Sequence, residues 1–407
     1  MSTLSAPRSI GTTIHGHVAP GFAPVAEAFA AAFDDPRSGA ALSIWRGGEP
    51  IADLWGGTAD ARDSRPWQED TIGVVFSCTK GLVSILAAQL IEAGRLDPDA
   101  PVSRYWPEYA ANGKAGTQVR HLLAHRAGLS APTLDITTAE ITDWAGMVRK
   151  LEQQEPLWPP GEAYAYHAIT HGWLVGEVLR RVTGRTVGQL FAESITGPLG
   201  VDAWIGLPAK EMPRVAHLTP SEAFRRQLAD AAASRPPGAV DWSERAATLG
   251  TALPPTLAEP AGGFNDQRLW AAEIPGAGGI MSARALAKIW SATVADTGGR
   301  RLLQPATVER LTVVESEGPP VFPVPPPWSR WGMGFQLDSE TRRFVTGRGF
   351  GHDGAGGQCG FAEPGLGIGF GFITHFMQGG GDLRATRIID ALRLCLVDQG
   401  AMTVANS

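Results

Sequence analysis

The sequence predicts an α+β fold, in which one lobe is a β-sheet built from both ends of the chain and a mainly helical lobe is inserted between them. Strand-like segments occur near the N-terminus and return near the C-terminus, whereas the segment between them has helical periodicity. We therefore expect residues 1–75 and 285–407 to form the sheet lobe and residues 76–284 to form the helical lobe. A cleft between two such lobes is a natural site for a small molecule.

The expected strands fall into two groups. Residues 40–46 and 51–55 are expected to form a pair, because the turn-forming sequence Gly47-Gly-Glu-Pro50 separates them. A proline-rich connector at 319–327 precedes the second group. The strands expected in this group are 334–338, 342–346, 359–363 and 367–374.

The expected helices lie mainly between these groups of strands. A strongly apolar segment, 81–91, predicts a buried helix that starts near Ser77. Thr219 and Pro220 are expected to open a helix that runs to about Ala232, and Asp382 is expected to cap a last helix that ends near Gly400. Other segments with helical periodicity are 117–126, 138–153, 168–182, 186–196 and 283–295. The loop-rich stretch 206–280 is expected to form one wall of the cleft.

Composition and charge argue against several classes of partner. The chain of 407 residues has a net charge of −6 and no run of basic residues, so we expect neither nucleic acid nor a membrane surface as a partner. No apolar stretch is long enough for a membrane span, and the first ten residues lack a signal-like apolar segment. The three cysteines show no metal-ligand spacing and cannot all pair. These features predict a cytoplasmic, thiol-reduced protein.

The first candidate for chemistry is Ser77-Cys-Thr-Lys80 at the start of the buried helix. Positions i and i+3 share one face of a helix, so the Lys80 amine can reach the Ser77 hydroxyl. Burial lowers the pKa of a lysine, and a neutral Lys80 could accept the proton of Ser77 as the hydroxyl attacks a carbonyl. Lys80 is the only lysine with a serine three residues before it. Read alone, the pattern also fits an ordinary helix start with a solvated lysine.

The second candidate is Tyr166, which lies just before a helical segment. A tyrosine at a helix entrance beside a lysine can move protons, although a packing tyrosine that caps a loop would look the same.

The third candidate is the glycine-rich segment 349–357. It contains a formal Gly-x-Gly-x-x-Gly, but it precedes a strand and opens no helix, so a dinucleotide site is rejected. Its glycines, Gly354 among them, suit a backbone edge whose amides face a substrate, and His352 could donate a hydrogen bond there.

Three other features favour structural interpretations. His121 and His125 have the i, i+4 spacing of metal ligands, but no glutamate follows His121, so no metal site is expected. Cys78 adjoins Ser77 but faces about 100° away from it on a helix. The sequence contains no Gly-x-Ser-x-Gly, which excludes the nucleophile elbow of the α/β-hydrolases.

Taken in order, these motifs resemble those of the serine β-lactamase and penicillin-binding-protein superfamily, and most closely its class C branch and the family VIII carboxylesterases. Ser77-Cys-Thr-Lys80 matches the nucleophile motif. Residues 119–129 are similar to a Leu-Leu-x-His-x-x-Gly-Leu segment, Tyr166 to the motif tyrosine, and His352-Asp-Gly354 to the Lys-Thr-Gly position or its His-x-Gly variant. The resemblance spans roughly residues 25–400 and implies an antiparallel sheet flanked by helices.

The resemblance also implies roles. Ser77 would be the nucleophile, Lys80 and Tyr166 would share its proton, and the backbone N–H groups of Ser77 and Ala355 would form an oxyanion hole. His352 would assist near the substrate or hold the tyrosine. No cofactor is implied, and the partner would be a small-molecule ester.

The chain departs from the pattern in two places. The family's Tyr-x-Asn motif reads Tyr166-His-Ala168 here, and starting the motif at Tyr164 instead restores no asparagine. The family's Lys-Thr-Gly motif is replaced by His-Asp-Gly, which removes a cation that would favour the carboxylate of a β-lactam. The expected function is therefore hydrolysis of small or short-acyl esters. Acyl transfer, amide hydrolysis, weak β-lactam hydrolysis and a non-catalytic binding role stay open as alternatives, as does the oligomeric state.

Overall fold

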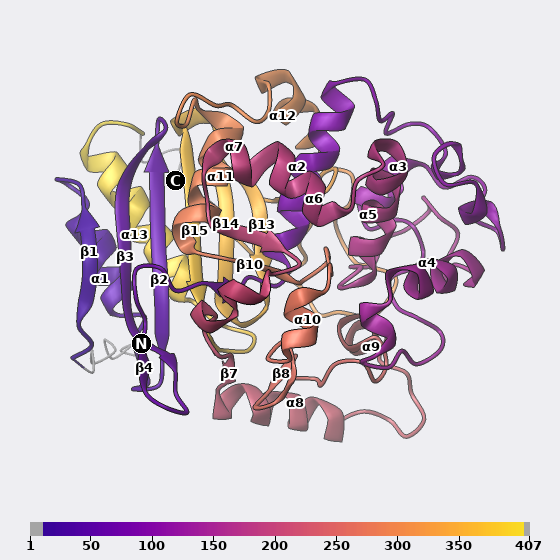
Figure 1. Ribbon diagram of the computed structural model, residues 1–407, viewed down its shortest axis with the longest axis horizontal. Coiled ribbons are helices and arrows are strands. Elements are labelled where there is room, and N and C mark those ends of the chain that lie inside the picture. Colours follow the sequence, from indigo (N-terminus) through magenta and orange to yellow (C-terminus); the bar gives the residue numbers. More distant parts are fainter. Residues whose placement is uncertain (1–10, 403–407) are drawn as a thin grey trace.

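The computed structural model describes residues 11–402, and its centre is a nine-stranded antiparallel sheet (Figure 1). Eight strands follow the order β1-β3-β2-β15-β14-β13-β12-β11, and β4 pairs with β3. Their bounds, in chain order, are β1 (Ile14–Val18), β2 (Gly39–Arg46), β3 (Glu49–Asp60), β4 (Arg65–Pro66), β11 (Arg330–Trp331), β12 (Gln336–Leu337), β13 (Phe350–Gly354), β14 (Gln358–Glu363) and β15 (Ile368–Thr374).

The two ends of the chain meet in the middle of this sheet. Strand β2 pairs with β15 in a register that runs from Ala40 opposite Thr374 to Arg46 opposite Ile368. The α+β fold with an antiparallel sheet is therefore confirmed. The exact division into lobes at 75/76 and 284/285 stays a prediction.

Helices cover both faces of the sheet (Figure 1). Helices α1 (Ala23–Ala30) and α13 (Arg384–Asp398) pack on one face, over a core of phenylalanine and aliphatic side chains. Helix α11 (Ala283–Val294) packs against β2, β14 and β15 on the other face. There the core continues into the helical region, so the sheet and the helices share one apolar interior.

The helical region begins with α2 (Cys78–Glu92), which lies against β13 and α5. The other helices are α3 (Val119–Leu123), α4 (Trp144–Gln153), α5 (Thr170–Thr183), α6 (Val187–Phe191), α7 (Gly197–Leu199), α8 (Glu222–Ala233), α9 (Trp242–Thr248), α10 (Gln267–Ala271) and α12 (Pro305–Leu311). Small sheets join β5 (Gly73–Val74), β10 (Gly279–Met281) and β6 (Ala203–Ile205), then β7 (Thr219–Pro220) with β16 (Phe376–Met377), and β8 (Ala258–Glu259) with β9 (Gly262–Gly263).

Three local predictions are wrong. Residues 342–346 form no strand, because Arg342 and Arg343 turn to different carboxylates, those of Asp353 and Asp338. Thr219 and Pro220 form strand β7, and the Ser221 hydroxyl caps the following helix instead by accepting the N–H of Phe224.

The third error concerns the last helix, whose N-cap is Leu383 without a side-chain hydrogen bond. Asp382 instead accepts the N–H of Arg384 and pairs with its guanidinium.

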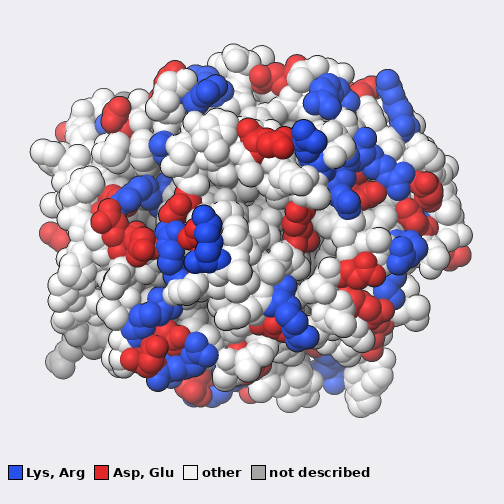
Figure 2. Space-filling model, viewed as in Figure 1, with Lys and Arg blue, Asp and Glu red and all other residues white. Residues whose placement is uncertain are grey.

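Acidic and basic side chains are interspersed over the face shown in Figure 2, with no broad area of one sign. None of the helices within residues 11–402 has both the length and the apolar character that crossing a membrane requires. The N-terminal segment that was assessed for a targeting signal, residues 1–10, lies outside the described residues.

Candidate active site

Ser77 lies at the N-terminal end of α2, with its side chain on the wall of a cavity. The preceding residue, Phe76, has φ 45°, in the left-handed region that a bulky residue rarely adopts. Its buried ring packs edge-on against Phe264, with ring centres 5.2 Å apart. The surrounding core thus holds a strained turn that presents Ser77 at the head of the helix, a feature that the sequence did not reveal.

Lys80 is fully buried one helical turn beyond Ser77. Its Nζ lies 2.9 Å from Ser77 Oγ, 2.6 Å from the Ala168 carbonyl oxygen and 2.7 Å from the Gly276 carbonyl oxygen. Burial holds the pKa of Lys80 well below the ordinary value of 10.5. The predicted contact between the serine and the lysine is therefore present.

This geometry suits a neutral amine. A neutral lysine has two N–H donors and one lone pair, and Lys80 has two carbonyl acceptors and one hydroxyl around it. In that state the two carbonyls accept its two N–H groups and its lone pair faces the Ser77 hydroxyl, whereas an ammonium would donate to all three oxygens. Among the ion pairs of the described residues none involves Lys80, so no carboxylate counteracts the effect of burial.

Tyr166 lies partly buried beside both groups. Burial raises the pKa of its phenol, and interaction with the Ser77 side chain opposes that rise. Lys80 Nζ lies over the tyrosine ring, 4.9 Å from its centre, and the ring stacks on Trp331 at 5.2 Å. Tyr164 also lines the cavity, but its hydroxyl donates to the Gly318 carbonyl, away from Ser77. The geometry thus favours Tyr166 over the alternative register.

Four buried histidines surround Lys80: His125, His167, His171 and His352. The His125 ring lies 5.1 Å from that of His171 and 5.7 Å from that of His167. Burial lowers the pKa of all four imidazoles, so the rings are neutral near pH 7. Sequence reasoning missed His167 and His171, whose only signal is their position next to the tyrosine motif.

His352 lies in strand β13, which is not among the strands predicted from the sequence. Its Nδ1 is 2.6 Å from the carbonyl oxygen of Asp353, and its ring is 6.0 Å from that of Tyr166. The thiol of Cys78 donates to the His352 carbonyl and is directed away from the cavity. Cys78 is thus a packing residue beneath the strand.

Strand β13 ends beside Ser77 and leads into a short turn, η6 (Ala355–Gly357). Both Gly354 and Ala355 line the cavity with Ser77. A Cβ atom at Gly354 would lie 2.3 Å from the carbonyl oxygen of Val75, so only glycine permits this approach to the turn before Ser77. The segment therefore brings the backbone of Ala355 to the same cavity as the serine.

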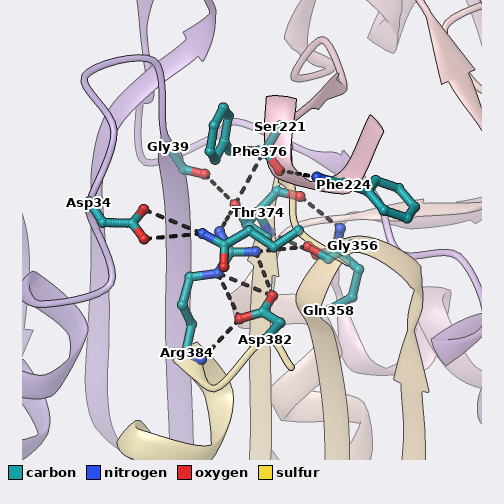
Figure 3. A network of polar contacts seen from close by, with 11 residues as sticks. Asp34, Gly39, Ser221, Phe224, Gly356, Gln358, Thr374, Phe376, Asp382 and Arg384 are labelled. Carbon is teal, nitrogen blue, oxygen red and sulfur yellow. Dashed lines mark hydrogen bonds and ion pairs between the residues drawn. The ribbon is translucent and has the colours of Figure 1, made fainter. Parts of the chain in front are cut away.

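A buried polar network supports this turn from behind (Figure 3). The Arg384 guanidinium donates to the Gly356 carbonyl at 2.9 Å and is neutralised by Asp382. Gln358 binds the backbone of Thr374 in strand β15 through both its amide oxygen and its amide nitrogen. The turn is thereby fixed to the central sheet and to helix α13.

The cavity above Ser77 has a volume of about 560 Å3 and is mainly apolar. The stretch 206–280 contributes Trp242, Leu257 and Ala277 to its lining, and the proline-rich connector contributes Phe322 and Val324. Sequence reasoning missed the connector as a wall. Within the described residues no group of three or more His, Cys, Asp or Glu side chains is arranged to hold a metal ion.

Comparisons with known proteins found relatives that span most of the chain. The model of the beta-lactamase family matches residues 25–393. Over 377 residues the chain is 33% identical to the esterase/beta-lactamase LipL of Mycobacterium tuberculosis (strain ATCC 25618 / H37Rv), covering 90% of this chain and 83% of that protein.

Two solved structures are similar over nearly the whole chain. A family VIII carboxylesterase has a TM-score of 0.82 and 35% identity, covering 94% of this chain and 100% of that chain. A penicillin-binding-protein homologue from Caulobacter crescentus has a TM-score of 0.81 and 34% identity, with the same coverage.

Proposed function

The chain belongs to the beta-lactamase family, and we propose that within it this protein is a serine carboxylesterase acting on small or short-acyl esters. The observation that carries the proposal is the buried amine of Lys80, 2.9 Å from Ser77 Oγ and with its donors occupied by two carbonyls. The apolar cavity around Ser77 and the similarity to a family VIII carboxylesterase support it further.

In the first step, Ser77 Oγ attacks the ester carbonyl carbon while its proton passes to Lys80 Nζ. A C–O bond forms to the serine, and the carbonyl oxygen becomes an oxyanion. The backbone N–H groups of Ser77 and Ala355 would stabilise that oxyanion; such donors contribute about 3 kcal/mol each. The Tyr166 hydroxyl relays the proton from Lys80 to the leaving alkoxide, so the alcohol departs neutral and an acyl-enzyme is left.

In the second step, water attacks the acyl carbon and gives its proton to the same pair of groups. The bond to Ser77 Oγ breaks, the serine recovers a proton, and the carboxylic acid is released. His352 would assist near the substrate or hold Tyr166; it lines the cavity from strand β13, and its buried Nε2 has no hydrogen-bond partner among the described residues.

The alternatives share this acyl-enzyme. An alcohol in place of water would give acyl transfer, and an amide or β-lactam in place of the ester would give the other hydrolyses. No lysine or arginine is among the residues that line the cavity, all of which the structure describes, and this disfavours a β-lactam carboxylate. A non-catalytic role is disfavoured by a desolvated lysine, because burying that amine costs stability and serves no packing purpose.

The test is mass spectrometry of the intact protein after incubation with a 4-nitrophenyl ester or with a fluorophosphonate, followed by peptide mapping. We expect one adduct, on Ser77, together with release of 4-nitrophenol. The matched control is Ser77→Ala, which should form no adduct and keep its melting temperature. An adduct on another residue, or none, would contradict the proposal.

We also propose a cytoplasmic location. Cys78, Cys359 and Cys395 are free thiols, which suits a reducing compartment. Cell fractionation with an antibody against the protein tests this, and recovery outside the cytoplasmic fraction would contradict it.

A further inference from the structure

The side chains that line the cavity indicate what kind of ligand it accepts. Two stacked ring pairs contribute to the wall: Trp242 with Phe322, 5.6 Å apart, and Tyr166 with Trp331, 5.2 Å apart. The members of each pair come from distant segments of the chain. Flat rings at such walls favour bulky apolar groups, and aromatic groups above all.

Among the acidic and basic side chains of the described residues, only an acidic one lines the cavity. Asp353 is the single ionisable carboxylate among the lining residues, all of which lie within 11–402, and no lysine or arginine accompanies it. The four histidines near Lys80 are neutral near pH 7, as argued above. The cavity therefore presents one negative group, two residues before the proposed oxyanion hole at Ala355.

The orientation of Asp353 is fixed from behind. Nε of Arg342 lies 2.9 Å from each carboxylate oxygen, and the Asp353 backbone N–H donates to Gln336 Oε1 at 2.8 Å. The Arg342 side chain is 11% exposed and that of Asp353 is 28% exposed. Because Asp353 lines the cavity and Arg342 does not, the ion pair turns its negative end toward the ligand.

We propose that the site takes uncharged esters with a bulky apolar group, and that Asp353 is a specificity-determining residue that excludes esters carrying a carboxylate. This rests on the proposed serine esterase function. An anionic substrate would meet a like charge in a poorly hydrated cavity that offers no compensating cation. A cavity without a cation would only fail to attract an anionic substrate, whereas the Asp353 carboxylate repels it.

The test compares two substrates that differ only at the far carboxyl group: 4-nitrophenyl methyl adipate and 4-nitrophenyl hydrogen adipate. We expect wild-type kcat/KM to favour the methyl ester by about 100-fold, and Asp353→Asn to reduce that preference by about tenfold or more, because it also leaves Arg342 unneutralised. The ratio does not depend on the fraction of folded enzyme, so a merely structural role of Asp353 would not change it.

The matched control is Asp338→Asn. Asp338 is also paired with an arginine, Arg343, but it does not line the cavity, so the preference should stay as in the wild type. A wild-type preference within about threefold, or an unchanged preference in Asp353→Asn, would overturn the inference. Acylation of Ser77 by both esters at equal rates overturns the selectivity alone, whereas no acylation of Ser77 by either ester overturns the esterase function as well.

If Asp353→Asn does not fold, inhibition of the wild type supplies the test. Phenylacetamide and phenylacetate have the same ring and differ in charge. The amide should bind at least about tenfold more tightly, and equal inhibition constants would overturn the inference.

Discussion

Lys80 and Lys114 are both fully buried, and the comparison between them shows that burial alone does not make a lysine a candidate base. Each ammonium position is bound by two backbone carbonyls, those of Ala168 and Gly276 for Lys80, and those of Glu152 and Gln154 for Lys114. Each also lies over a tyrosine ring, 4.9 Å from Tyr166 and 5.7 Å from Tyr109 respectively.

The difference lies in the remaining neighbours. Burial lowers the pKa of Lys114, but the carboxylates of Glu152 and Glu155 oppose that effect. No carboxylate among the described residues opposes the effect of burial at Lys80, and the third neighbour of its nitrogen is the hydroxyl of Ser77. A buried lysine becomes a candidate base when carboxylates are kept away and a hydroxyl occupies the position of its lone pair.

The largest effect is expected from replacing each lysine by methionine. Lys80→Met should reduce kcat/KM by about 10^4-fold, because Ser77 loses its base. Lys114→Met should leave kcat/KM within about twofold but destabilise the protein by about 2 kcal/mol, since two carbonyls lose their donor. Rates of ester hydrolysis measure kcat/KM, and thermal unfolding measures stability. Comparable losses of activity in the two variants would contradict the distinction between a catalytic and a structural lysine.

The two tyrosines provide the next test. Tyr166→Phe keeps the ring over Lys80 but removes the hydroxyl, and should reduce kcat by about 10^2-fold to 10^3-fold. Tyr109→Phe, beside Lys114, should leave kcat unchanged. In the double variant Lys80→Met/Tyr166→Phe the losses should not add, because both groups move the same proton. Full additivity in that double-mutant cycle would show that they act separately.

The pH dependence should follow Lys80. Its pKa is lowered in the folded protein, so the amine is neutral above that pKa and becomes protonated as the pH falls through it. The value of kcat/KM should therefore fall about tenfold per pH unit on the acid side, with a midpoint well below 10.5. A non-activated methyl ester avoids spontaneous hydrolysis in this assay. The same acid limb should persist in Lys114→Met, and a midpoint near 10.5 would contradict the neutral base.

The smallest effect is expected at Glu152. Glu152→Gln removes a carboxylate that favours the charged form of Lys114, while the new amide oxygen still accepts the Trp106 indole N–H. The free energy of unfolding should fall by about 1 kcal/mol or less near pH 7, with kcat unchanged. Denaturant unfolding measures this loss. Higher stability in the variant would mean that Lys114 is neutral in the folded protein.

Local sequence patterns predicted the parts of the site that lie within one helical turn or one strand. Ser77 and Lys80 are such a case, because their i, i+3 spacing brings them together in any helix. The carbonyl of Gly276, almost 200 residues further along the chain, is a tertiary contact that no local pattern encodes. The strand expected at 342–346 failed for a more local reason, since carboxylates only 11 and 5 residues away along the chain bind Arg342 and Arg343.

The aromatic wall was missed because composition cannot show which rings meet. Phe322 lies in a segment whose prolines indicate only a connector, and Trp331 lies outside every predicted strand and motif. Both gain a role in the cavity only through packing. Asp353 was visible in the sequence, but its orientation depends on Arg342 behind it.

The pairing of β2 with β15 constrains how the protein can be made. Residues 39–46 leave the ribosome early, but the partner of their strand, residues 368–374, is among the last to be synthesised. The centre of the sheet therefore cannot close during most of translation, and the edge of β2 that faces β15 remains unpaired for that time, although β1, β2 and β3 can pair with one another. Helix α13, whose Arg384 holds the turn beside Ser77, is later still. A nascent chain that lacks its last 40 residues should thus be inactive and dependent on chaperones.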